Sequence, residues 1–222
     1  MPDEIIDYYW SYRSHYCYLS IDRVIAIEND WPVTINLRPV YPIAIRTPEF
    51  FANIPTSGSN RWAYIMHDTE RTAERLGIAF AWPNPDPVVM NMTTFNIAKE
   101  QPYIYRLTRL GIEACRQSRG LAFTAAVSRL IFGGRPGWDQ GDVLKNALSH
   151  IGLDLTAMEK MIEADPDDYD AEIKANEAAL AEAGHWGVPT LVLRGEPFFG
   201  QDRIDDLSWR LEKLGVSKIG PA

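Results

Sequence analysis

The N-terminal stretch of the chain places an apolar strand directly before a helix that starts at a hydroxyl side chain. The apolar and aromatic run from Ile5 to Trp10 predicts a buried strand, and Ser14 is predicted to cap a helix that runs toward Asp30. The first turn of a helix leaves backbone N–H groups unpaired and carries partial positive charge, so an anion beside Ser14 is stabilised there. Such a position suits a thiolate, which makes Ser14 a candidate reactive-site residue.

The next apolar segment predicts a strand that pairs with the first one. Val33, Ile35 and Leu37 alternate with polar neighbours, which indicates a second strand within residues 31–40. A strand, a helix and a strand in this short span favour a parallel, right-handed βαβ unit. Residues 42–59 are rich in Pro, Gly, Ser and Asn, so we expect a long irregular connection there.

A block of helices is predicted to follow, without intervening strands. One helix is expected from Ser59 to a stop at Gly77, and the proline-rich segment from Phe80 to Val88 predicts a rigid loop that presents Trp82. The sequence pattern predicts further helices at about residues 102–117, 121–132, 140–151, 154–163 and 167–183.

The C-terminal part returns to strands. Thr190 to Leu193 predicts a strand, Pro197 to Phe199 a short edge strand after a turn, and Asp202 the cap of a last helix. The whole order predicts an α/β domain formed by residues 1–41 and 165–222. Residues 42–164 are then an all-helical insertion into that domain.

Charge and composition exclude several classes of partner. The formal net charge is −8 and no block of Lys or Arg is present, which argues against a nucleic-acid partner. No apolar run reaches the roughly 18 residues of a membrane span, and the acidic start lacks a basic stretch followed by an apolar one, so we expect a cytoplasmic protein. An exposed apolar face of the helical insertion is compatible with a homodimer.

Cysteine and histidine spacing predicts no metal site and no dithiol chemistry. Cys17 and Cys115 are far apart and match neither a zinc pattern nor a CxxC pair. Cys17 is predicted to be a packed thiol. The four histidines show no metal-ligand spacing, and each is predicted to be a surface or cap residue: His15, His67, His150 and His185.

Two motifs together resemble the reactive centre of the thioredoxin fold. Gly187-Val-Pro-Thr190 before a strand resembles the cis-proline loop, and Ser14-His-Tyr-Cys17 stands where the redox CxxC begins the first helix. With Tyr18-Leu19 and Gly200-Gln-Asp-Arg-Ile204, the chain resembles the 2-hydroxychromene-2-carboxylate isomerase family. That family and the kappa-class glutathione transferases form a glutathione-using branch of the disulfide-oxidoreductase-like thioredoxin proteins. This resemblance implies a thioredoxin-like fold (βαβ…ββα) with a large all-helical insertion. The family pattern is Ser-Pro-Tyr, and this chain has His15 in place of the proline.

The resemblance also implies a glutathione site. Ser14 would hydrogen-bond the glutathione sulfur, the backbone of Val188 would pair with the cysteinyl part, and Gln201 and Asp202 would bind the γ-glutamyl end. Asn53 matches an asparagine in the family's long loop. Ser14 and Asp202 as plain helix caps and Val188 as core packing are the alternative readings.

Four further residues carry open alternatives. Arg61 matches a family lysine position before the Trp62 helix but is equally compatible with a solvated side chain. Tyr16 and Trp82 are candidates for the aromatic wall of a second-substrate pocket, with ordinary packing as the alternative. Arg13 either attracts a substrate carboxylate or is solvated, and we favour the solvated side chain.

The function implied by the resemblance is a glutathione-dependent isomerase acting on an unsaturated aromatic pyruvate, with glutathione as a cofactor that is returned unchanged. A kappa-like transferase or peroxidase would use the same thiolate and consume it. A non-catalytic glutathione-binding protein is a third hypothesis. Disulfide exchange through Cys17 is the weakest, because Cys17 has no resolving partner.

Overall fold

The computed structural model describes residues 4–49, 60–91, 94 and 96–219, with the side chains of residues 60 and 61 outside the described part. Its centre is a four-stranded sheet in the order β2-β1-β3-β4. The strands are β1 (Glu4–Trp10), β2 (Val33–Pro39), β3 (Thr190–Leu193) and β4 (Glu196–Phe199). β1 pairs with β2 in parallel and with β3 in antiparallel orientation. The predicted βαβ…ββα order is therefore confirmed.

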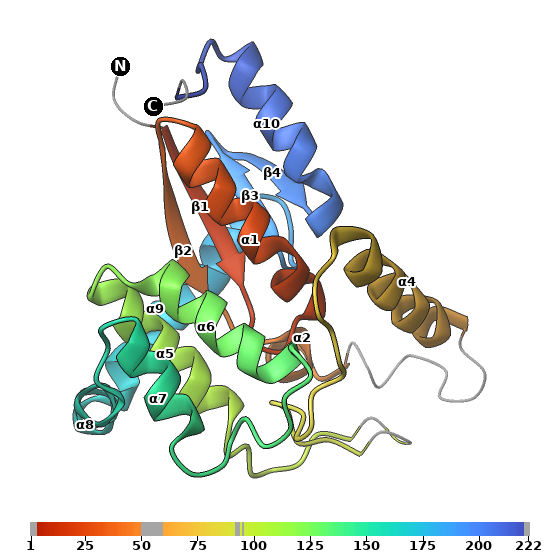
Figure 1. Ribbon diagram of the computed structural model, residues 1–222. Coiled ribbons are helices and arrows are strands. Elements are labelled where there is room, and N and C mark those ends of the chain that lie inside the picture. Colours follow the sequence, from red (N-terminus) through yellow and green to blue (C-terminus); the bar gives the residue numbers. More distant parts are fainter. Residues whose placement is uncertain (1–3, 50–59, 92–93, 95, 220–222) are drawn as a thin grey trace.

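The alternation of side chains along β1 assigns its two faces to different helices. Ile6, Tyr8 and Trp10 are fully buried in the main core with helix α1 (His15–Asp30), and the Tyr8 hydroxyl lies 2.6 Å from Ser20 Oγ on that helix. Tyr9 points to the opposite face, where it joins a smaller cluster with Leu180. Leu180 belongs to helix α9 (Pro166–Glu182), which lies behind the sheet in Figure 1.

The remaining helices gather around one end and one side of the sheet. Helices α5 (Ile104–Arg116), α6 (Gly120–Phe132), α7 (Val143–His150) and α8 (Leu155–Ala164) form a block at one end, and α4 (Asn60–Leu76) lies to the side (Figure 1). These helices confirm the predicted ones to within a few residues at each end. Residues of the predicted α/β domain and of the predicted insertion contribute to one hydrophobic cluster, so this cluster does not mark a boundary between them. The boundaries at residues 41/42 and 164/165 stay a prediction.

Two local predictions need correction. The connection after β2 is not wholly irregular, because residues Ile43–Arg46 form the short helix α2. Asp202 does not cap the last helix. It lies inside a 3-10 turn, η1 (Gln201–Arg203), that runs directly into α10 (Ile204–Lys213), so the chain already turns at Gly200, where φ is 107°.

One isolated antiparallel bridge, between Met90 and Ile97, lies in the segment before α5. It is too short to form a strand, so no named strand lies between β2 and β3 in the described residues. Among those residues, no helix is both long and apolar enough to cross a membrane.

Candidate functional site

Ser14 caps helix α1 and also faces a neighbouring loop. Its Oγ accepts the N–H of Cys17 at 3.2 Å, which confirms the predicted cap. The same hydroxyl donates to the carbonyl oxygen of Val188 at 3.5 Å, a long and therefore weak hydrogen bond. The N–H groups of His15 and Tyr16, in the first helical turn, have no intrahelical acceptor. The hydroxyl and these N–H groups together make the end of the helix favourable for an anion.

The loop that faces Ser14 has the predicted cis-proline geometry. The Val188–Pro189 peptide bond is cis. Thr190 Oγ1 donates to the Gly187 carbonyl at 2.7 Å, and the Gly187 N–H donates to His185 Nδ1 at 2.9 Å. These bonds fix the loop so that the Val188 carbonyl points at Ser14. Val188 itself is half-buried and packs against both hydrophobic clusters, so its predicted binding role and its packing role are compatible.

A cavity of about 600 Å³ opens between the Ser14 end of α1, the cis-proline loop, α2 and α4. Four residues predicted for the site line this cavity: Ser14, Tyr16, Trp82 and Val188. Most of the wall is apolar, with aromatic side chains prominent: Tyr16, Trp62, Trp82, Phe132, Trp186 and Phe199. The volume and the lining are typical of a site for a small organic ligand.

Tyr16 and Trp82 are held in the wall by polar contacts as well as by packing. The Tyr16 hydroxyl donates to Asp68 Oδ2 at 2.8 Å, and Trp82 Nε1 donates to Glu70 Oε1 at 3.0 Å, so both rings are anchored to α4. Burial, together with the Asp68 carboxylate, raises the pKa of Tyr16, so this phenol stays protonated at neutral pH. It therefore acts as a neutral wall residue.

His15 is not the surface or cap residue that its spacing predicts. Its ring lies between Tyr16, at a centroid distance of 4.5 Å, and Trp82, at 5.3 Å, and it lines the cavity. Its Nε2 is buried and has no hydrogen-bond partner among the described residues. Burial, helped by the Arg13 charge, lowers the pKa of His15 to about 4, so the imidazole is neutral at pH 7.

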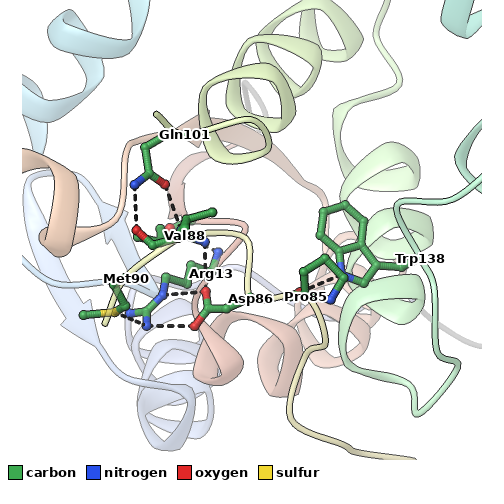
Figure 2. Close-up of polar contacts among 9 residues, drawn as sticks. Arg13, Pro85, Asp86, Val88, Met90, Gln101 and Trp138 are labelled. Carbon is green, nitrogen blue, oxygen red and sulfur yellow. Dashed lines mark hydrogen bonds and ion pairs between the residues drawn. The ribbon is translucent and has the colours of Figure 1, made fainter. Parts of the chain in front are cut away.

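Arg13 is not solvated, which corrects the favoured prediction. Its guanidinium forms a bidentate ion pair with Asp86, with Nε at 2.8 Å from Oδ1 and Nη2 at 2.9 Å from Oδ2, and it also contacts Met90 Sδ (Figure 2). Both charged side chains line the cavity. The sequence pattern gave no signal for Asp86, because a carboxylate in a proline-rich loop has no periodicity that marks its partner.

Other polar contacts hold the Asp86 loop in place. Asp86 Oδ1 also accepts the N–H of Val88 at 2.8 Å, and Trp138 Nε1 donates to the Pro85 carbonyl at 2.8 Å (Figure 2). The side-chain amide of Gln101 pairs with both the N–H and the carbonyl of Val89. These hydrogen bonds therefore fix the loop as an ordered part of the cavity wall.

Neither cysteine has the environment of a redox centre. Cys17 is fully buried, and burial raises the pKa of its thiol to about 12. Burial also raises the pKa of Cys115 to about 12. Both thiols are free, and the thiolate that disulfide exchange requires is scarce at neutral pH. In the described residues, no group of three or more His, Cys, Asp or Glu side chains is arranged to hold a metal.

Four residues of the predicted glutathione site are not among the described lining residues. Gln201 is buried, and its carbonyl accepts Arg23 Nη1 at 2.7 Å. Asp202 is exposed and lies 3.5 Å from Arg203. Asn53 and the side chain of Arg61 fall outside the described residues. The roles assigned to these four residues remain predictions.

Arg46 lines the cavity, although its position in the sequence does not predict this. It ends α2, in the stretch expected to be irregular, and its side chain is only 11% exposed. Its Nε donates to the Tyr41 carbonyl at 2.6 Å and its Nη2 to the Trp186 carbonyl at 2.9 Å. Both acceptors are backbone carbonyls, which no residue type marks, and Trp186 lies far along the chain, so no sequence spacing pointed to Arg46.

Comparison with known proteins agrees with this geometry. A model of the DSBA-like thioredoxin domain matches residues 5–212. A comparison with curated proteins gave no match.

Three solved structures share the fold. A 2-hydroxychromene-2-carboxylate isomerase is 22% identical, with a TM-score of 0.71, over 95% of this chain and 96% of that one. A probable DsbA oxidoreductase from Streptomyces coelicolor is 20% identical, with a TM-score of 0.64, over 99% and 92% of the two chains. The cytosolic disulfide reductase DsbM from Pseudomonas aeruginosa, solved with GSH, is 14% identical, with a TM-score of 0.57, over 95% and 98%.

Proposed function

Because the chain belongs to the family of DSBA-like thioredoxin domains, we propose that it is a glutathione-dependent isomerase of the 2-hydroxychromene-2-carboxylate type. The proposed reaction is the cis/trans isomerisation of an unsaturated aromatic pyruvate. One observation supports this most: the Ser14 hydroxyl lies at the N-terminus of α1 and on the wall of a cavity rich in aromatic side chains.

The groups around Ser14 fit a thiol peptide. The Ser14 hydroxyl is engaged only weakly by the Val188 carbonyl, at 3.5 Å, so its proton is available to a stronger acceptor such as a thiolate. The Val188 N–H makes no hydrogen bond to another described residue. An extended peptide can pair with the backbone of Val188 as an added strand would, whatever its own side chains.

The helix terminus and the Ser14 hydroxyl can supply the free energy that is needed to ionise a bound thiol at neutral pH. A thiol with an ordinary pKa of about 8.5 needs a shift of about two units, or roughly 3 kcal/mol, to be mainly ionised at neutral pH. The helix terminus contributes about 0.3–1 kcal/mol and a hydrogen bond to a charged group about 1.5–3 kcal/mol. The end of α1 and the Ser14 hydroxyl therefore suffice without a buried base.

Glutathione, when bound, would supply a nucleophilic thiolate that is recovered after the reaction. In this proposal Ser14 holds the negative charge of the sulfur, and Tyr16 and Trp82 orient an aromatic substrate and keep water away from it. The neutral state of His15 and Tyr16 keeps the wall free of additional charge near the thiolate.

The comparisons support this reading at the level of fold. The isomerase of similar structure covers nearly the whole chain, and the DsbM structure was solved with GSH. Disulfide oxidoreductases share the same fold. We favour isomerisation over disulfide exchange because Ser14 replaces the first cysteine and the Cys17 thiol is buried, with its pKa raised to about 12 by burial.

Calorimetry with glutathione, followed by an isomerisation assay, tests the proposal. Ser14→Ala removes the hydroxyl, and Ser14→Asp keeps a good helix cap while removing the donated proton and adding negative charge. Both variants should lose at least tenfold in isomerisation rate, whereas Ser149→Ala, an exposed serine on α7, should behave as wild type. Absence of glutathione binding to the wild-type protein would reject the proposed function.

The amount of glutathione that remains after turnover separates the alternative functions. Recovery of all glutathione after many turnovers supports isomerisation, whereas consumption of one glutathione per turnover supports a kappa-like transferase or peroxidase at the same Ser14 site. Binding without turnover of either kind supports a non-catalytic glutathione-binding protein. An aromatic small molecule as substrate and a homodimer remain part of the proposal.

A further inference from the structure

Among the described residues that line the cavity, Arg46 is a cation with no carboxylate partner in the cavity wall. The charged side chains among its described lining residues, with His15 neutral, are Arg13, Arg46 and Asp86. Arg13 and Asp86 neutralise each other through two short contacts, of 2.8 and 2.9 Å. Arg46 is then the lining cation whose nearest printed carboxylate, Glu177, lies outside the cavity lining and 4.0 Å away.

The Arg46 guanidinium is fixed in place but retains free donors. Its two bonds go to the backbone carbonyls of Tyr41 and Trp186, and its Nη1 donates to no described residue. The nearest carboxylate, Glu177, reaches only 4.0 Å and accepts the Tyr41 N–H at 3.1 Å. Since a guanidinium has five N–H donors and stays charged, a ligand anion can still bind to it.

Arg46 and Ser14 hold the same loop from two positions. Arg46 binds the carbonyl of Trp186, and the Ser14 hydroxyl binds that of Val188. Two residues of chain span at most about 7 Å. A thiol peptide that pairs with Val188 and has its sulfur at Ser14 would therefore have its next groups within reach of Arg46. In glutathione, the C-terminal carboxylate is one residue beyond the cysteinyl sulfur.

We propose that Arg46 binds the C-terminal carboxylate of glutathione in this cavity, an inference that rests on the proposed function. The guanidinium provides paired N–H donors that match a carboxylate, and the surrounding apolar wall strengthens the contact by excluding water. Arg46 thus selects a thiol ligand with a free carboxyl terminus.

Comparison of two ligands tests this assignment. Calorimetry measures the binding of glutathione and of its glycyl ethyl ester, in which an uncharged ethyl ester replaces the C-terminal carboxylate. The wild-type protein should bind glutathione about tenfold or more tightly than the ester. Arg46→Gln should bind both ligands with equal affinity, and Arg46→Lys should keep part of the preference. Arg194→Gln, at an exposed arginine paired with Glu4, is the matched control and should keep all of it.

The ratio of the affinities for glutathione and for its ester, measured within each variant, separates recognition of the carboxylate from general damage to the loop. A distorted loop weakens the binding of both ligands alike and leaves this ratio unchanged. Equal binding of the two ligands by the wild-type protein, or a full preference retained in Arg46→Gln, would overturn the assignment. The assignment of Arg46 to glutathione is also wrong if Arg46→Gln weakens only the binding of an aromatic carboxylate. Arg46 would then bind the second substrate. Failure of wild type to bind either ligand rejects the proposed function instead.

Discussion

Among single residues, His15 shows that burial, rather than position in the sequence, sets the protonation state of a side chain. Its spacing predicted an exposed or capping histidine, but the ring packs between Tyr16 and Trp82. Burial lowers the pKa of His15 from 6.5 to about 4. The sequence could not predict this, because Trp82 comes from a loop far along the chain.

A pH dependence of stability follows from this buried imidazole. The folded-state pKa lies below the unfolded one, so the unfolded chain binds the extra proton and stability falls as the pH drops from about 6.5 to about 4. The wild-type protein should therefore lose about 2–3 kcal/mol more of its unfolding free energy than His15→Phe between pH 7 and pH 4.5. Urea unfolding at the two pH values measures the difference. His67→Phe, at an exposed position on α4, serves as the control, and an equal loss in wild type and His15→Phe would contradict the account.

At the level of helices and loops, one partly buried ion pair joins the Asp86 loop to the connection before α1. The side chains of Arg13 and Asp86 are only 17% and 29% exposed. Asp86→Asn leaves the partly buried guanidinium without its charged partner and should lower the free energy of unfolding by about 1–3 kcal/mol. Thermal or urea unfolding checks this value.

An exposed ion pair provides the matched control. Asp22 pairs with Arg129, and their side chains are 51% and 54% exposed. Asp22→Asn should change the unfolding free energy by no more than about 0.5 kcal/mol. Equal losses in the two variants would show that the Asp86 loop is not held by this pair.

The helices and strands were predictable because each carries its own periodic pattern or cap. The structure confirms the strand predicted from the alternation of Val33, Ile35 and Leu37, and it confirms the predicted Ser14 cap. The predicted Asp202 cap is wrong, because Asp is equally compatible with the 3-10 turn that precedes α10. Asp86 and Arg46 were missed because their partners are set by tertiary contacts that no local pattern encodes.

At the scale of the whole molecule, the helical insertion and the sheet domain share one hydrophobic cluster. Tyr12, just after β1, is fully buried, and its hydroxyl lies 3.0 Å from Thr124 Oγ1 on α6. Gly111 on α5 packs against the same ring: an added Cβ would lie 2.8 Å from Tyr12 Cε2. The fold class was predicted from element order and motif resemblance, whereas this close approach was visible only in three dimensions.

Gly111→Ala should therefore destabilise the whole protein despite the higher helix propensity of alanine. Overpacking against Tyr12 should lower the unfolding free energy by about 1–3 kcal/mol, with a single cooperative transition in far-ultraviolet and near-ultraviolet circular dichroism. In a Tyr12→Leu background the effect of Gly111→Ala should shrink. Undiminished destabilisation in that background would contradict the proposed contact.

In the proposed complex, Ser14 and the end of α1 stabilise a glutathione thiolate. An ultraviolet titration of thiolate absorbance on the glutathione complex tests it most directly, because burial holds the pKa values of both protein thiols at about 12, outside the range of interest. The pKa of bound glutathione should lie about two units below the ordinary thiol value of about 8.5 in wild type and in Ser149→Ala. It should return at least one unit toward that value in Ser14→Ala. An ordinary pKa in the wild-type complex, or one unchanged by Ser14→Ala, would contradict the account.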